Sequence, residues 1–60
     1  MKKLLSVQEV AEILDMHPDT VYILLRRGDL VGMKMPGLRG RWKVEESAIE
    51  SFVRRNTDRP

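Results

Sequence analysis

Two helix-start signals lie close together near the beginning of this chain, and their spacing limits the possible folds more than any other feature. Ser6 and Glu9 form a Ser-x-x-Glu capping box, in which each side chain accepts a hydrogen bond from the backbone N–H of the other residue. Pro18 gives the second signal, because its fixed φ and missing N–H suit the first turn of a helix, where Asp19 complements the helix dipole. Two separate helices are therefore expected to begin within this short stretch.

Apolar residues recur at helical spacing after each signal. The first predicted helix, residues 7–15, carries an apolar stripe made of Val7, Val10, Ala11 and Leu14. The second, residues 18–27, carries one made of Val21, Leu24 and Leu25. His17 is then the N-cap of the second helix, and Gly28 stands where a left-handed C-terminal cap is usual. Because only residues 15–17 remain for the turn, the two helices must cross steeply as a helix-turn-helix.

After Gly28 the apolar pattern changes from helical spacing to the alternation of a strand. Val31, Met33 and Met35 alternate with Gly32 and Lys34, and Trp42 and Val44 alternate with Arg41 and Lys43. Residues 36–40, with the sequence PGLRG, supply a turn between the two strands. In the expected hairpin, Lys34, Arg41 and Lys43 share the face opposite Trp42, and Arg39 lies at the tip.

A third helix is predicted over residues 45–55, and residues 57–60 are expected to form a frayed tail. The apolar residues of this helix are Ala48, Ile49, Phe52 and Val53. The expected fold is mostly α with a small β-hairpin: a helix-turn-helix, a two-stranded hairpin and a third helix in one domain spanning residues 1–60. A domain of 60 residues has a thin core, because it buries only about 60% of the surface of its unfolded chain.

Charge is distributed unevenly, although the net charge is only +2. Residues 6–19 contain four acidic residues and no Lys or Arg, whereas residues 20–44 contain six cations against Asp29 alone, a net charge of +5. Such a basic block predicts attraction to a polyanion. DNA and RNA are favoured over a membrane surface, since the charge does not lie on one long amphipathic helix.

Composition argues against several other classes of protein. The chain has no cysteine and a single histidine, His17, so neither a disulfide nor a metal site is expected. It has no Gly-rich phosphate loop and little room for a preorganised pocket, so we expect neither an enzyme nor a cofactor. No apolar run approaches the roughly 20 residues of a membrane span, and a soluble cytoplasmic protein associated with the nucleoid is expected.

The helix-turn-helix and the hairpin supply the candidate binding residues. In DNA-binding examples the second helix enters the major groove, and a following hairpin, the wing, reaches phosphates or the minor groove. The second helix offers Thr20, Tyr22, Ile23, Arg26 and Arg27. The wing, residues 33–43, offers Lys34, Arg39, Arg41 and Lys43.

A structural explanation competes with each of these assignments. The helix pair can be a plain corner that packs a core, and the hairpin cations can simply protect a sheet edge from aggregation. Trp42 shares the face of Val44, so a core position is favoured over stacking on a base. For Tyr22, at the border of the exposed side, a phosphate hydrogen bond and simple surface packing remain equally open.

With these residues placed, the chain resembles the excisionase-like DNA-binding family within the MerR superfamily of winged helix-turn-helix proteins. The resemblance covers about residues 5–53 and rests on the order of "LSVQEVAEIL", "TVYILLRRGDL" and "GRWKVEESAIESFV". It implies groove-facing or phosphate-facing positions for Thr20, Tyr22 and Arg26, and a place on the wing for Arg39 and Arg41. The chain departs from the family at two positions: Asp15, where glycine is frequent, and Ile23, where a polar or basic residue is frequent.

The resemblance predicts sequence-specific binding of double-stranded DNA. The biological role would be that of an excisionase, a recombination directionality factor beside an integrase or recombinase, or that of a small transcriptional regulator beside RNA polymerase. The sequence lacks the long helix through which MerR regulators dimerise, so a monomer that binds adjacent DNA repeats cooperatively is expected. A winged-helix protein-interaction module, with the exposed Ile23 and Tyr22 at its contact, is the alternative, and RNA binding has less support because no aromatic platform is present.

Overall fold

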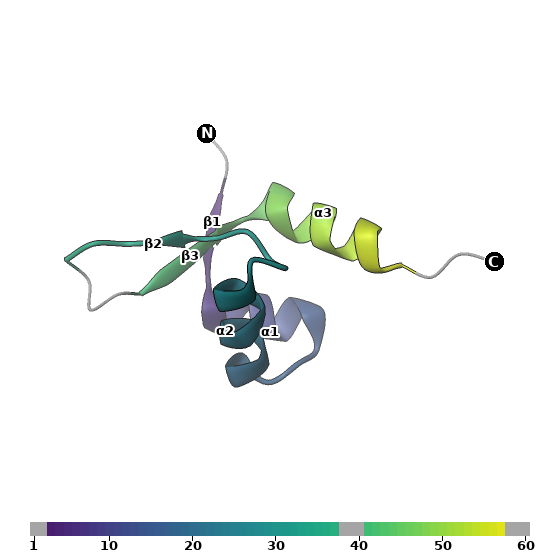
Figure 1. Cartoon of the computed structure of the whole chain (residues 1–60), viewed down its shortest axis with the longest axis horizontal. Coiled ribbons are helices and arrows are strands. Elements are labelled where there is room, and N and C mark those ends of the chain that lie inside the picture. The colour runs from purple at the N-terminus through teal and green to yellow at the C-terminus, as the bar shows by residue number, and fades with distance from the viewer. Residues whose placement is uncertain (1–2, 38–40, 58–60) are drawn as a thin grey trace.

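A computed structural model describes residues 3–37 and 41–57 of the chain. Its elements, in chain order, are β1 Leu4–Ser6, α1 Val7–Leu14, α2 Pro18–Arg27, β2 Met33–Lys34, β3 Trp42–Glu45 and α3 Glu46–Asn56. The two crossed helices α1 and α2 lie on one side of a small sheet, the β2–β3 arm extends beyond them, and α3 leaves from the opposite end of β3 (Figure 1). The predicted class, mostly helical with a small antiparallel sheet and the order of a winged helix-turn-helix, is confirmed.

The caps around the first turn follow the sequence prediction closely. Glu9 N–H donates to Ser6 Oγ (3.1 Å) and Ser6 N–H donates to Glu9 Oε1 (2.9 Å), which completes the capping box. Asp15 ends α1 in the left-handed conformation, with φ of 55°, a conformation that aspartate tolerates better than most residues. His17 caps α2 by accepting from Asp19 N–H through Nδ1 at 3.0 Å, and Gly28 ends that helix at φ of 82°.

The sheet has three strands in the order β1-β3-β2, so the predicted hairpin is joined by a strand that the sequence analysis did not identify. β1 pairs antiparallel with β3, placing Leu5 opposite Val44, and both side chains are buried. Leu5 directly precedes the helix cap Ser6, and no strand was predicted there. The strand is too short, at three residues, for alternation to reveal it.

The two faces of the sheet correct the predicted hairpin. Lys34 pairs directly with Trp42, and Met33 pairs with Lys43. Directly paired residues project from the same face of a sheet, so Lys34 lies on the face of Trp42. The prediction that Lys34 lies on the opposite face is wrong. The cause is Gly32, which turns inward against Leu25 and Val44 and so sends Met33 outward.

The core lies between the inner face of the sheet and the two crossed helices. Its fully buried side chains are Val10, Val21, Leu30 and Val44. Trp42 is half-buried and packs against this core, as expected from its alternation with Arg41 and Lys43. At the other end, Arg55 Nη2 donates to the Asp29 carbonyl at 3.0 Å, which fastens α3 to the loop after α2.

Candidate nucleic-acid interface

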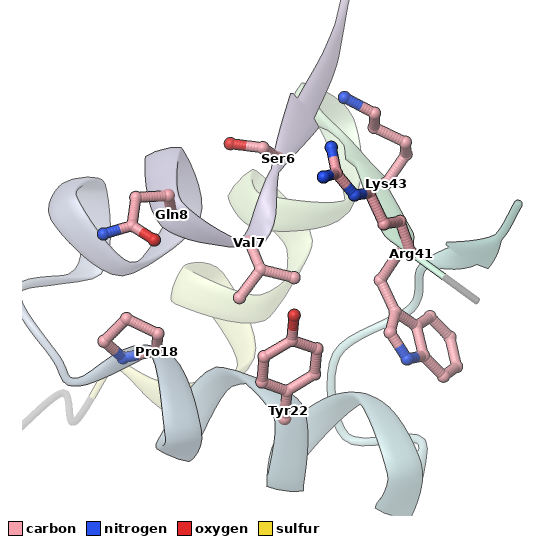
Figure 2. A pocket seen from close by; sticks show the side chains of 8 residues that line it. Ser6, Val7, Gln8, Pro18, Tyr22, Arg41 and Lys43 are labelled. Carbon is pink, nitrogen blue, oxygen red and sulfur yellow. The ribbon is translucent and has the colours of Figure 1, made fainter. Parts of the chain in front are cut away.

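A cleft of about 410 Å³ separates the starts of α1 and α2 from the base of the wing (Figure 2). Its lining residues come from three parts of the chain, namely Ser6, Val7, Gln8, Pro18, Tyr22, Arg41, Trp42 and Lys43. α2 crosses α1 so that Pro18 and Tyr22 line the cleft together with residues 6–8. The pairing of β3 with β1 places residues 41–43 at the other side of the cleft. One wall is therefore helical and the other is basic.

Tyr22 forms the floor of the cleft. For this residue the sequence left two roles open, surface packing and a hydrogen bond to a phosphate. Its ring is half-buried and packs against the core, while its hydroxyl is directed toward Val7 and into the cleft (Figure 2). The ring thus has a packing role, and the hydroxyl remains a hydrogen-bond donor at the cleft surface. The packing alternative therefore describes the ring, and a phosphate contact of the hydroxyl stays a prediction.

Arg41 and Lys43 supply the positive charge of the cleft. Arg41 directly precedes β3 and Lys43 lies within it, so both side chains project from the same face of the strand. Within residues 3–37 and 41–57, the ion pair between an Arg or Lys and a carboxylate is that of Arg27 with Asp29, and it involves no wing cation. Arg41 and Lys43 therefore keep their charge available to an anion.

Glu9 lies close enough to the basic wall for the charge of Lys43 to act on it, and its carboxylate is already hydrogen-bonded in the capping box. The Ser6 N–H is the largest cause that lowers the pKa of Glu9 below its ordinary value of 4.5; hydrogen bonding by the Ser6 hydroxyl and the charges of Lys3 and Lys43 add to it. The capping box thus favours the ionised carboxylate, and Glu9 is not among the residues that line the cleft.

The exposed residues of α2 divide between two flanks of the helix. Arg26 follows Tyr22 by about 40° around the helix axis and so lies on the flank that faces the cleft. Thr20 lies about 160° from Tyr22, and Arg27 lies on the same flank as Thr20. Arg27 also pairs with Asp29, at 3.2 Å between Nε and Oδ2. Arg26 therefore shares the flank of Tyr22 without lining the cleft itself, and Thr20 and Arg27 lie on the other flank.

Three further predicted residues lie outside the cleft. Ile23 projects from the exposed side of α2 with 49% of its surface accessible. Lys34 is exposed on β2, on the face of Trp42. Arg39, predicted at the wing tip, lies outside the described residues.

Sequence reasoning missed Gln8 as a lining residue. It was placed only on the polar side of the first helix, because its spacing shows that it avoids the core and nothing more. Its side-chain amide in fact borders the cleft beside Pro18 (Figure 2). Gln8 reaches the cleft because the pairing of β1 with β3 places the start of α1 next to β3. β1 was not predicted, so this position of Gln8 was not predicted either.

Other kinds of site find no support in the part of the chain that the structure describes. No group of three or more His, Cys, Asp or Glu side chains within it could hold a metal ion. Among its helices, none combines the length and the apolar character needed to cross a membrane.

Crossed helices with left-handed Asp15 between them, followed by a basic wing, define a winged helix-turn-helix protein. The chain belongs to the family of helix-turn-helix domains, whose family model matches residues 4–57. No curated protein and no solved structure matches the chain. A helix-turn-helix domain is a fold of DNA-binding proteins, so the family and the basic cleft indicate the same class of ligand.

Proposed function

We propose that this protein binds double-stranded DNA in a sequence-specific manner through α2 and the wing. The observation that carries the proposal is the cleft, whose lining brings together Arg41 and Lys43, both free of ion pairs among the described residues, and Tyr22 of α2. A DNA backbone presents phosphates along the edge of the major groove that a recognition helix enters. The cleft would hold one such phosphate.

The proposed mechanism separates charge neutralisation from base reading. Arg41, Lys43 and the remaining wing cations Lys34 and Arg39 contact phosphates, and Tyr22 donates a hydrogen bond to the phosphate in the cleft. Arg26 lies on the same flank as Tyr22, nearest to the bases, where arginine pairs best with guanine. Ile23 is placed to contact a thymine methyl group, while Thr20 and Arg27 meet the far side of the groove.

The output of binding would be DNA architecture or gene control, without chemistry. An excisionase role, in which the protein bends DNA beside an integrase or recombinase, and a role as a small transcriptional regulator beside RNA polymerase both use this interface. In either role we propose a cytoplasmic protein of the nucleoid that acts without a cofactor and binds neighbouring repeats cooperatively.

The exposed Ile23 supports a second candidate, a winged helix that binds another protein. An isoleucine with 49% of its surface accessible in the middle of a recognition helix is an apolar contact point. Ile23→Arg separates the candidates. It keeps or raises affinity for random-sequence DNA if α2 enters the groove, and it damages partner binding if this side of α2 meets a protein.

The decisive experiment is a fluorescence-anisotropy titration of duplex DNA at several salt concentrations, followed by selection from a random library. Contacts to about three to five phosphates predict that log K falls with log[salt] at a slope of about −0.9 per phosphate. Saturable binding with this dependence and an enriched motif supports the proposal. Absence of binding even at low salt rejects it in favour of the protein-interaction candidate.

A further inference from the structure

The outer face of the sheet, turned away from α1 and α2, carries exposed apolar side chains that the DNA-binding proposal does not use. Leu4, Val31 and Met33 have 40%, 64% and 43% of their surfaces accessible. A groove of about 190 Å³ lies on this face and is lined by Val31, Gly32, Met33, Lys43, Glu45 and Ala48. Apolar side chains gathered on one face in this way mark an interaction surface more often than isolated ones do.

Strand pairing fixes how the residues of this face are arranged. Leu4 is opposite Glu45, Ser6 is opposite Lys43 on the same side, and Met33 is opposite Lys43 on the other. Val31 lines the groove beside Glu45, two residues before Met33. The face therefore has two rows across the strands, one of Leu4, Glu45 and Val31 and one of Ser6, Lys43 and Met33.

These two rows complement each other. Lys43 and Glu45 are two residues apart on β3, so their side chains stand about 7 Å apart on one face with opposite charge. A two-fold axis that crosses the strands between them places Lys43 of one copy over Glu45 of the other, and Glu45 over Lys43. The same axis places Met33 over Val31 of the second copy and Leu4 over Ser6. An isologous contact needs such a self-complementary patch.

We propose that the outer face of the sheet is the surface through which two copies of this protein associate. The contact is small, because it involves three strands of two to four residues each. It falls below the roughly 1,200 Å² of a standard interface, so the dissociation constant is expected on the order of 0.1 to 1 mM. Dilute protein is then monomeric, and association becomes measurable only in concentrated solution or where two copies are held close together.

This proposal does not depend on DNA binding, so it is tested on the protein alone. Sedimentation equilibrium over about 0.02 to 1 mM should show a monomer–dimer equilibrium in the full chain. Lys43→Glu and Glu45→Lys each replace both attractive pairs of the dimer by repulsive ones, and each should lower the association constant by about tenfold. The double variant Lys43→Glu/Glu45→Lys restores opposite charges across the axis and should recover association to within about threefold of the original protein.

The apolar contribution is tested with a matched pair of substitutions. Met33→Ser should lower the association constant several-fold, whereas Ile13→Ser, which removes an exposed apolar side chain from α1, should leave it unchanged. Circular dichroism spectra and thermal unfolding establish that each variant is folded, which matters for Glu45 because it accepts a hydrogen bond from Ser47 Oγ at 3.2 Å.

Three outcomes would overturn the proposal. Folded protein that stays monomeric to about 1 mM shows that a second copy does not cover this face. Association that all the variants leave unchanged places the contact elsewhere on the protein. Single variants that weaken association while the folded double variant fails to restore it reject the two-fold arrangement.

Discussion

Gly32 lies so close to Leu25 that a Cβ added to the glycine would stand 2.6 Å from Leu25 Cδ2. The Lys43 carbonyl and a methyl group of Val44 lie 3.2 and 3.3 Å from the same point. A side chain at this position would have to displace Leu25 Cδ2 for the loop after α2 to pass between that helix and β3. This close approach also decides which residues of β2 face outward.

Gly32→Ala should destabilise the fold by about 1 to 3 kcal/mol, because the added methyl group overpacks the contact with Leu25 and the backbone of β3. Urea denaturation measures the free energy of unfolding. The control is a double-mutant cycle with Leu25→Ala, which removes the closest atom, so the cost of Gly32→Ala should fall in that background. Equal costs in both backgrounds would show that the contact with Leu25 is not the cause.

Stability should depend on pH through Glu9. Its pKa is lower in the folded state than its ordinary value of 4.5, chiefly because the Ser6 N–H donates to its carboxylate. Stability from the ionised group is therefore present above pH 4.5 and is lost as the pH falls through the folded pKa. The decrease in melting temperature from neutral to acid pH should therefore be larger in the original protein than in Glu9→Gln, whose side chain keeps an acceptor but has no charge. Parallel curves would remove Glu9 from the acid-sensitive groups.

Tyr22→Phe separates the two roles of this side chain. The ring that packs against the core remains, so the free energy of unfolding should change by less than about 0.5 kcal/mol. Loss of the hydroxyl in the cleft should weaken DNA binding by about 0.5 to 1.5 kcal/mol on every sequence alike. Anisotropy titrations with a preferred and a random duplex make this comparison. Unchanged affinity on both would leave Tyr22 with a packing role alone.

Arg41→Ala tests the basic wall of the cleft. One fewer phosphate contact should reduce the salt dependence of log K by about 0.9 and weaken all DNA sequences equally. The matched control is Arg54→Ala, which removes an exposed cation from α3, away from the cleft, and should leave the slope unchanged. If the two variants behave alike, the wing does not contact phosphate at Arg41.

Arg26→Ala should behave differently from Arg41→Ala, because it acts on sequence preference. It should cost about 1 to 3 kcal/mol on the preferred site and much less on random DNA, as expected for a side chain that pairs with a base edge. Arg54→Ala is again the control, since Arg54 is an exposed cation on α3 that the proposed interface does not include. An equal loss on both duplexes would assign Arg26 to a phosphate.

Local rules predicted the helices and their caps well, because each signal there acts over a few residues. The Ser6–Glu9 box, the His17 cap and the left-handed Gly28 cap all depend on backbone and side-chain groups within four positions. Helix boundaries accordingly agree with the predicted ones to within about one residue.

Pairing between distant segments was predicted less well. Leu5 belongs to a strand only because Val44, far along the chain, is available to pair with it. Lys34 was assigned to the wrong face because alternation cannot show which of two faces is buried. Gly32 against Leu25 decides that question, and a contact between two elements is not visible in local spacing. The cleft depends both on local helix signals and on pairing between distant strands. The sequence therefore identified Arg41 and Tyr22 as candidate binding residues but did not identify Gln8.

Lys43 borders both the cleft beside Tyr22 and the groove on the outer face of the sheet. The Lys43 ammonium group binds a phosphate more weakly while it pairs with Glu45 of a second copy. DNA binding and self-association therefore oppose each other. By reciprocity, DNA would lower the self-association constant by the same factor by which self-association lowers DNA affinity. The concentration of monomer able to bind DNA would then rise less than in proportion to the total protein concentration. Self-association would thus buffer DNA binding without a small-molecule effector.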